Sequence, residues 1–263
     1  MSSSPLRTGL QTLQSSWRHF GLRQTVLQAG MLGVVAAGRA SMALDEVFHR
    51  EYHDVEVRRP VFIIGAPRSG TTFFHRLLTQ TNEFPCWHTW ELFVPSLTAR
   101  NIVHPLVPHV VRVLGKGFQD DSTLMGEAHR TSSDSIEEEE MLFVLRLDSQ
   151  FVNVFTPVGF DERDHEDLVY ADAQPDAQRL ASARFLKGCL QRQIAFTGRT
   201  QVVAKLPYST LRVRTLLEVF PDARFVYMAR SPFETLPSHM TLHRGFFAQR
   251  YGLENIGEER LAA

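Results

Sequence analysis

The residues best suited to chemistry lie in one short segment, Gly65–Thr72, which reads Gly-Ala-Pro-Arg-Ser-Gly-Thr-Thr. Its glycines let the backbone turn so that N–H groups can approach a bound anion closely. Arg68 adds a positive charge, and the hydroxyls of Thr71 and Thr72 add hydrogen-bond donors. The segment therefore predicts a phosphate- or sulfate-binding loop; a plain glycine-rich turn is the alternative.

The elements around the loop favour an anion site. Val61–Gly65 is a short, apolar, β-branched run that predicts a buried strand, and Thr71–Gln80 has apolar residues at helical spacing. A loop between a strand and a helix lies at the N-terminal end of the helix dipole, which attracts negative charge.

The loop differs from the nucleotide-triphosphate P-loop at one position that matters. Gly65 and Gly70 have the P-loop spacing, but Thr71 occupies the position of its lysine. No acidic magnesium ligand is evident at a strand end, so triphosphate hydrolysis would lack its main electrostatic groups. A nucleotide kinase or NTPase with an altered loop is one alternative function, and a catalytically degenerate nucleotide-binding relative is another.

Further strands and helices follow in the second half of the chain. Gln201–Lys205 and Arg224–Ala229 predict strands. Ser209 is expected to cap a helix that Pro221 ends, and another helix is expected to begin near Pro232. This alternation predicts an α/β fold, a P-loop-like three-layer arrangement with a central, mostly parallel sheet flanked by helices.

Two motifs resemble a known enzyme family. Ala66–Thr72 is similar to the 5′-phosphosulfate loop of sulfotransferases that use 3′-phosphoadenosine 5′-phosphosulfate (PAPS), in the branch of bacterial and tyrosyl-protein sulfotransferases. Phe225–Pro232, followed by Ser238, resembles the family's 3′-phosphate segment, a strand that ends in Arg with a Ser on the next helix. The resemblance covers about residues 60–250, and its middle part matches loosely.

The resemblance implies sulfuryl transfer from PAPS to an acceptor hydroxyl or amine, without a required metal. It implies that the 5′-phosphosulfate is held by Arg68, Ser69, Gly70, Thr71 and Thr72, and the 3′-phosphate by Arg230 and Ser238. Lys205, at a strand end, would neutralise the leaving phosphate, and Glu91 would take the acceptor's proton. His88 is an alternative base, and His239 is expected to be structural.

Composition limits the partners. The formal net charge of -1 gives no basic field of the kind that nucleic-acid binding needs. Cys86 and Cys189 have no metal-ligand spacing, and the 11 histidines form no metal motif, so no metal site is expected. A small-molecule, lipid-like or glycan acceptor is expected, and the 19 phenylalanines favour an aromatic or lipid-like one weakly.

Residues 1–59 are expected to form a helical lead-in before a sulfotransferase domain at 60–263. Residues 1–44 contain arginine but no acidic residue, and Val26–Ala37 is apolar yet shorter than the about 20 residues that span a bilayer. Three interpretations are open: a helix packed on the core, a basic amphipathic segment at a membrane surface, or an organellar presequence. The expected location is cytoplasmic, with membrane association through residues 1–44 as an option.

Two further features lead to expectations. The acidic run Glu137–Glu140 precedes an apolar run; Ser135 with Glu138 would form a capping box, and the helix dipole would favour these charges. A substrate-facing role for the four glutamates is the alternative. The chain stops at Ala263 without the basic, glycine-containing loop that closes over the 3′-phosphate in the family, so the domain is expected to be truncated.

Overall fold

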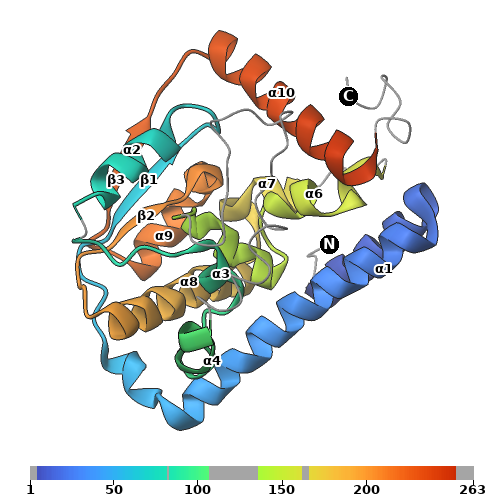
Figure 1. The fold of residues 1–263 in the computed structure, drawn as a ribbon. Coiled ribbons are helices and arrows are strands. Elements are labelled where there is room, and N and C mark those ends of the chain that lie inside the picture. The colour runs from blue at the N-terminus through green and yellow to red at the C-terminus, as the bar shows by residue number, and fades with distance from the viewer. Residues whose placement is uncertain (1–4, 82, 107–135, 162–165, 253–263) are drawn as a thin grey trace.

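A short parallel sheet organises the protein (Figure 1). The computed structural model describes residues 5–81, 83–106, 136–161 and 166–252. The sheet has the order β2-β1-β3 and consists of β1 (Val61–Gly65), β2 (Val203–Lys205) and β3 (Arg224–Met228). Both neighbours run parallel to β1, with Ile63 opposite Lys205 on one side and Val226 on the other. The predicted α/β fold with a parallel sheet is therefore confirmed.

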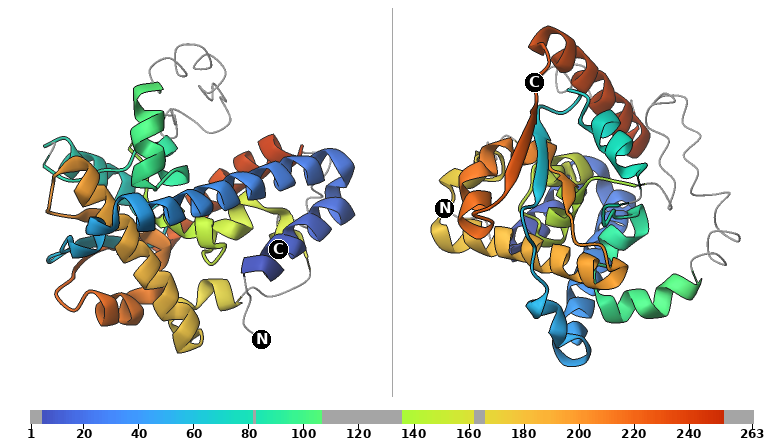
Figure 2. Two further views of the ribbon diagram at one scale, coloured as in Figure 1. Left: turned by 90° about the horizontal axis from the view of Figure 1, so that it is seen from below. Right: turned by 90° about the vertical axis from the view of Figure 1, so that its left-hand side faces the viewer.

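Helices lie on both sides of this sheet. Figure 2 shows α2 (Thr71–Thr79) on one side and α9 (Val213–Val219) on the other. Phe62 and Ile64 of β1 pack with α9 and with α8 (Asp176–Thr197) in the main hydrophobic core. Because side chains alternate along a strand, Ile63 and its partner Lys205 point to the side of α2, where the phosphate loop ends.

Short helices connect the larger elements, and several are 3₁₀ helices (η). They are η1 (Arg50–Asp54), α3 (Thr89–Phe93), α4 (Leu97–Val103), η2 (His104–Leu106), η4 (Glu139–Arg146), α6 (Phe151–Phe155), η5 (Pro157–Phe160), α7 (Glu166–Val169), η6 (Ala171–Ala173) and η7 (Pro207–Arg212). The last described helix is α10 (Pro232–Tyr251), which begins where Pro232 predicts.

The predicted helix cap at Ser209 is wrong. The chain forms η7 first, and α9 then begins with Arg212 at the N-cap position. The Ser209 hydroxyl donates instead to Glu140 Oε2 at 2.8 Å, a partner 69 residues earlier. The Ser209 hydroxyl therefore bonds to the buried Glu140 carboxylate and does not cap a helix. Ser135, the first member of the other predicted cap, lies outside the described residues.

The N-terminal helix α1 (Pro5–Phe48) buries polar side chains and exposes apolar ones. It is kinked at Gly21, and it buries polar side chains, including Thr12, Ser16 and Gln28. Its exposed side chains are largely apolar: Leu6, Leu10, Trp17, Leu22, Val26, Leu27, Val34, Leu44, Val47 and Phe48. By length and composition α1 would suffice to cross a bilayer, a criterion that core helices and signal sequences also meet.

A buried carboxylate fastens α1 to the rest of the molecule. Asp45 accepts hydrogen bonds from the Ser96 hydroxyl at 2.8 Å and from the Leu97 N–H at 3.0 Å, where α4 begins. Arg192 of α8 donates to the same carboxylate at 2.7 Å. Burial by itself would raise the pKa of Asp45, but the hydrogen bonds from Thr98, Arg192 and Ser96 outweigh it and lower the pKa. One buried anion therefore joins three helices.

Candidate active site

The phosphate loop makes a tight turn between β1 and α2. Gly65 has φ 145° and Gly70 has φ 96°, both in the range that L side chains rarely adopt. A Cβ on Gly65 would lie 2.5 Å from the Met228 carbonyl oxygen of β3, so a side chain there would displace the strand. The loop can therefore stay close to β3 only because this position is glycine.

The loop offers hydrogen-bond donors to an anion. Helix α2 starts directly after Gly70, with no side-chain cap, so its first N–H groups point out of the helix end. The Ser69 hydroxyl is buried and has no hydrogen-bond partner among the described residues. Buried polar groups normally find a partner, and a phosphate or sulfate oxygen would supply one. The loop therefore fits the donor that the sequence motif implies.

Arg68 connects the two predicted phosphate segments. Its Nε donates to Ser238 Oγ at 2.9 Å, although the two residues are 170 positions apart. Arg230 Nη1 donates to the Arg68 carbonyl oxygen at 3.2 Å, and its Nε pairs with Glu234 at 3.1 Å. The fold thus places Arg230 and Ser238 beside the loop, as a site for one ligand with two anionic groups requires.

Lys205 reaches the loop from the end of β2. Its side chain is only 4% exposed, and Nζ donates to Thr72 Oγ1 at 3.1 Å. The same ammonium pairs with Glu138 Oε2 at 3.0 Å. A fixed positive charge at this position could stabilise negative charge that develops on a ligand held by the loop.

An acidic segment surrounds Lys205. Glu139 Oε2 accepts the Lys205 backbone N–H at 2.6 Å, and Glu140 accepts from Ser209 as described above. Burial raises the pKa of Glu139 to about 8 and that of Glu140 to about 7. The sequence analysis explained the acidic run Glu137–Glu140 by the helix dipole and did not predict its contact with Lys205. The sequence does contain a signal, because four adjacent glutamates are notable in a chain with three lysines. A single sequence does not show, however, that the glutamates contact one of those lysines.

His75 forms the buried floor behind this segment. Its ring is 1% exposed, and Nε2 lies 3.9 Å from Glu139 Oε1. Burial, together with the charges of Lys205 and Arg76, lowers the pKa of His75 to about 3. The imidazole is therefore neutral at ordinary pH, and Lys205 does not face a second cation there.

Glu91, the base that the resemblance implies, has other partners in the structure. It lies at the start of α3, where its Oε2 accepts the His88 backbone N–H at 2.8 Å in a capping box. Its Oε1 lies 3.7 Å from Arg100 Nη1, and both side chains are almost fully buried. These contacts explain Glu91 as a helix cap, while its role as a base stays a prediction. His239 packs on His243 within α10, with ring centroids 4.1 Å apart.

The comparison with known families decides the class of the protein. The family model described as "Sulfotransferase family" matches residues 60–263, which include the loop, Lys205, Arg230 and Ser238. This chain belongs to the sulfotransferase family. The resemblance of its two phosphate motifs to that family is confirmed.

Mycobacterial sulfotransferases are similar to this family member in sequence and in fold. The omega-hydroxy-beta-dihydromenaquinone-9 sulfotransferase Stf3 of Mycobacterium bovis and that of Mycobacterium tuberculosis are each 27% identical over 192 residues, 72% of this chain and 46% of theirs. The chain thus spans about half the length of these curated relatives. The sulfotransferase STF9 of Mycobacterium avium superposes with a TM-score of 0.76 at 21% identity, over 99% of this chain and 66% of the other.

A second solved structure agrees. The sulfotransferase STF1 of Mycobacterium tuberculosis superposes with a TM-score of 0.75 at 20% identity, over 98% of this chain and 68% of the other. At these identities the two structures establish the shared fold.

Proposed function

We propose that this sulfotransferase moves a sulfuryl group from PAPS to an acceptor hydroxyl or amine. The observation that carries the proposal is the hydrogen bond between Arg68 and Ser238, which joins the 5′ loop to the 3′ segment. A donor with one anionic group would use the loop alone, whereas PAPS carries a second phosphate for Arg230 and Ser238 to bind. PAPS also has no triphosphate, so the missing P-loop lysine is no obstacle.

Each site residue then has a task. Arg68, Ser69, Gly70, Thr71 and Thr72 hold the 5′-phosphosulfate, and Arg230 and Ser238 hold the 3′-phosphate. Lys205 stabilises the charge that builds on the departing 5′-phosphate, as positioned cations do in phosphoryl transfer. The remote 3′-phosphate contributes binding free energy that orients the reacting end. This chemistry needs no metal ion.

For the acceptor we propose a lipid-like molecule with a terminal hydroxyl. The names of the Stf3 relatives specify an omega-hydroxy dihydromenaquinone as their acceptor. In the present chain, aromatic rings extend from Tyr208 through Phe151 and Phe155 to Phe246 of α10, with successive centroids 4.9, 5.6 and 5.8 Å apart. Burial raises the pKa of Tyr208, and the charges of Glu138 and Glu140 act on it in the same direction. Such a row of rings suits an apolar chain whose end must reach Lys205.

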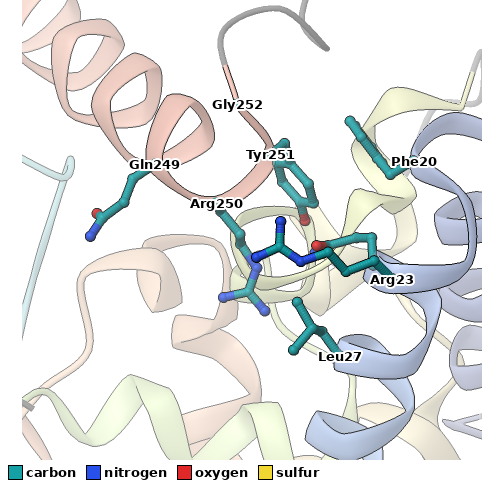
Figure 3. Close-up of a pocket in the computed structure, with 8 residues that line it drawn as sticks. Phe20, Arg23, Leu27, Gln249, Arg250, Tyr251 and Gly252 are labelled. Carbon is teal, nitrogen blue, oxygen red and sulfur yellow. The ribbon is translucent and has the colours of Figure 1, made fainter. Parts of the chain in front are cut away.

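A cytoplasmic protein that rests on a membrane would collect such an acceptor, and we propose this location. The exposed face of α1 is apolar, residues 1–44 carry arginine without acidic residues, and Trp17 is 61% exposed. Arg23 of α1 and Arg250 of α10 lie together at a hollow of about 260 Å³ (Figure 3). Within the described chain, the residues that line this hollow include no acidic one, as suits an anionic headgroup.

Calorimetric titration tests the donor. Adenosine 3′,5′-bisphosphate, the product that remains after transfer, is titrated into the protein, and ATP is compared with and without Mg²⁺. We expect metal-independent binding of the bisphosphate that weakens in Arg68→Ala and in Arg230→Ala. Preferential binding of ATP with Mg²⁺ would replace this proposal by the kinase alternative, and binding of neither would favour a degenerate relative.

Cosedimentation with vesicles tests the location. The protein should pellet with vesicles that contain phosphatidylglycerol and remain in solution with pure phosphatidylcholine. The double variant Val26→Glu/Val34→Glu, on the exposed face of α1, should abolish pelleting. The control is Asn101→Glu on the exposed side of α4. Thr98 of the same helix is unsuitable as a control because its backbone N–H donates to Asp45. Equal pelleting of both variants would contradict membrane contact through α1.

A further inference from the structure

Glu138 is held at the place where donor and acceptor would meet. Its Oε2 lies 3.0 Å from Lys205 Nζ, and that ammonium is 3.1 Å from Thr72 of the loop. The charge of Glu138 also acts on Tyr208, the first ring of the aromatic row, and raises the pKa of that phenol in the same direction as burial does. The side chain of Glu138 is 19% exposed, so a ligand can reach it, in contrast to its buried neighbours.

The backbone around Glu138 is fixed by contacts on both sides. Ile136 forms an antiparallel bridge with His88, and the Glu137 N–H donates to the Trp87 carbonyl at 3.1 Å. After Glu138, the carboxylates of Glu139 and Glu140 are tied to β2 and η7 as described above. A carboxylate on such a rigid segment is preorganised, which is what a catalytic group requires.

We propose that Glu138 is the general base of the transfer, and that the donor frees it by taking Lys205 from it. The proposal rests on the proposed function. Without ligand, Glu138 and Lys205 neutralise each other in a nearly buried pair. When the phosphosulfate enters the loop, its oxygens compete for the ammonium at Thr72, and the carboxylate loses its cation on the side where the acceptor arrives.

The step balances in atoms and charge. Glu138 takes the proton of the acceptor hydroxyl while the acceptor oxygen forms a bond to sulfur. The bond between sulfur and the bridging phosphate oxygen breaks, and that oxygen keeps the electron pair. Lys205 and Arg68 face the charge left on the 5′-phosphate of adenosine 3′,5′-bisphosphate. The products are this bisphosphate and the sulfated acceptor, and the proton on Glu138 returns to water.

Glu138 suits this task better than Glu91 does. Glu91 is 3% exposed, and both its oxygens are engaged, one in the cap of α3 and one beside Arg100. Freeing it would leave a buried arginine without its counter-charge, which is costly. At Glu138, in contrast, Lys205 exchanges one anionic partner for another as the ligand binds, and the carboxylate that it leaves is 19% exposed, so no fully buried charge loses its partner.

Three glutamine variants test the proposal: Glu138→Gln, Glu91→Gln for the rival base, and Glu137→Gln as a control with the same change one residue away. Calorimetry with adenosine 3′,5′-bisphosphate measures donor-site affinity. Turnover is followed as release of the bisphosphate from PAPS, with a long-chain primary alcohol, with a phenol and with water alone. Glutamine has the shape of glutamate and cannot accept the proton.

We expect Glu138→Gln to lower turnover at least about 100-fold, the usual contribution of a general base. Its affinity for the bisphosphate should rise about three- to tenfold, because Lys205 no longer has to leave a carboxylate. Glu137→Gln should keep turnover within about threefold of wild type. Glu91→Gln should lower the free energy of unfolding, because Arg100 then lacks its counter-charge, but should retain more turnover than Glu138→Gln. The rise in affinity is the readout that a merely structural role of Glu138 would not produce.

Other results would overturn the proposal in identifiable ways. Turnover retained in Glu138→Gln and lost in Glu91→Gln would assign the base to Glu91. Weaker binding of the bisphosphate in Glu138→Gln would show that Glu138 serves to position Lys205. Unchanged binding would show that Lys205 does not move from Glu138 to the donor. Wild-type protein that binds no bisphosphate would contradict the proposed function itself, which the wild-type titration reveals before any variant is made.

Discussion

The two ends of the proposed donor site differ in burial. At the 5′ end, Lys205 is 4% exposed and its ammonium is held by Thr72 and Glu138. At the 3′ end, the Arg230 side chain is 45% exposed and pairs at the surface with Glu234 of α10. A buried charge is screened weakly and holds its position, whereas an exposed ion pair contributes little and yields easily. We therefore expect the 5′ end to control the rate and the 3′ end to control affinity.

Lys205→Ala is the strongest test of this difference. Removal of a preorganised charge at the reacting group should lower turnover about 100- to 1000-fold. Affinity for adenosine 3′,5′-bisphosphate should change less than about tenfold, because in the free protein Lys205 is already paired with Glu138. Steady-state kinetics and calorimetry measure the two quantities, and Lys187→Ala on α8 is the matched control. Near-normal turnover would remove Lys205 from the mechanism.

Arg230→Ala should show the opposite pattern at the exposed end. We expect affinity for adenosine 3′,5′-bisphosphate to fall about tenfold, with turnover at saturating PAPS unchanged. Adenosine 5′-phosphate lacks the 3′-phosphate, so its affinity should be equal in wild type and variant. Arg244→Ala, at an exposed arginine of α10, is the control. An equal loss for both nucleotides would mean that Arg230 does not bind the 3′-phosphate.

His75→Gln tests the buried character of the 5′ end by pH. The pKa of His75 is lowered to about 3 in the folded protein from an ordinary 6.5. Between these two pH values the unfolded chain therefore binds a proton that the folded protein does not bind. The contribution of His75 to the free energy of unfolding of the wild type is fully present above pH 6.5 and falls by about 1.4 kcal/mol per pH unit below it. Urea unfolding at pH 7.5 and pH 5.5 should show the stability difference between wild type and variant shrinking as the pH falls. A constant difference would mean that His75 titrates normally.

Ser238→Ala should have the smallest effect. The hydroxyl accepts one hydrogen bond from Arg68 and is partly exposed, and such a bond contributes about 1 kcal/mol. Affinity for adenosine 3′,5′-bisphosphate should fall about threefold, measured by calorimetry, with no change in turnover. Ser231→Ala, before α10, is the control. A loss as large as that of Arg230→Ala would contradict the view that this end depends mainly on charge.

The sequence predicts what is local in this protein. The loop, its flanking strand and helix, and the start of α10 all follow from residues within one segment, and the structure has them. What the sequence cannot supply is contact between distant segments. Glu139 meets Lys205 across 66 positions, and Ser209 leaves its expected cap for Glu140 across 69. Four adjacent glutamates before an apolar run satisfy the helix-dipole rule equally well, so local rules could not distinguish a cap from an active site.

Glu91 teaches the same lesson from the opposite direction. Its distance from the loop along the chain suggested a base, but His88 and Arg100 already occupy its carboxylate. Glu91 closes a capping box, but the N-cap there is His88 and not the usual Ser or Thr, so the sequence did not show the pattern. Where a local rule and a resemblance compete for one residue, the partners in space have to be known.

The buried anion at Asp45 has a consequence for the order of events during synthesis. Arg192, its charged partner, leaves the ribosome 147 residues later. Until then, the first helix carries a carboxylate that cannot be buried without an unpaired charge, together with an apolar face. We therefore expect α1 to dock late, after α8 has formed, so that the newly made chain exposes the apolar face of α1 until Arg192 has been synthesised. That interval is when a chaperone or a membrane would find it.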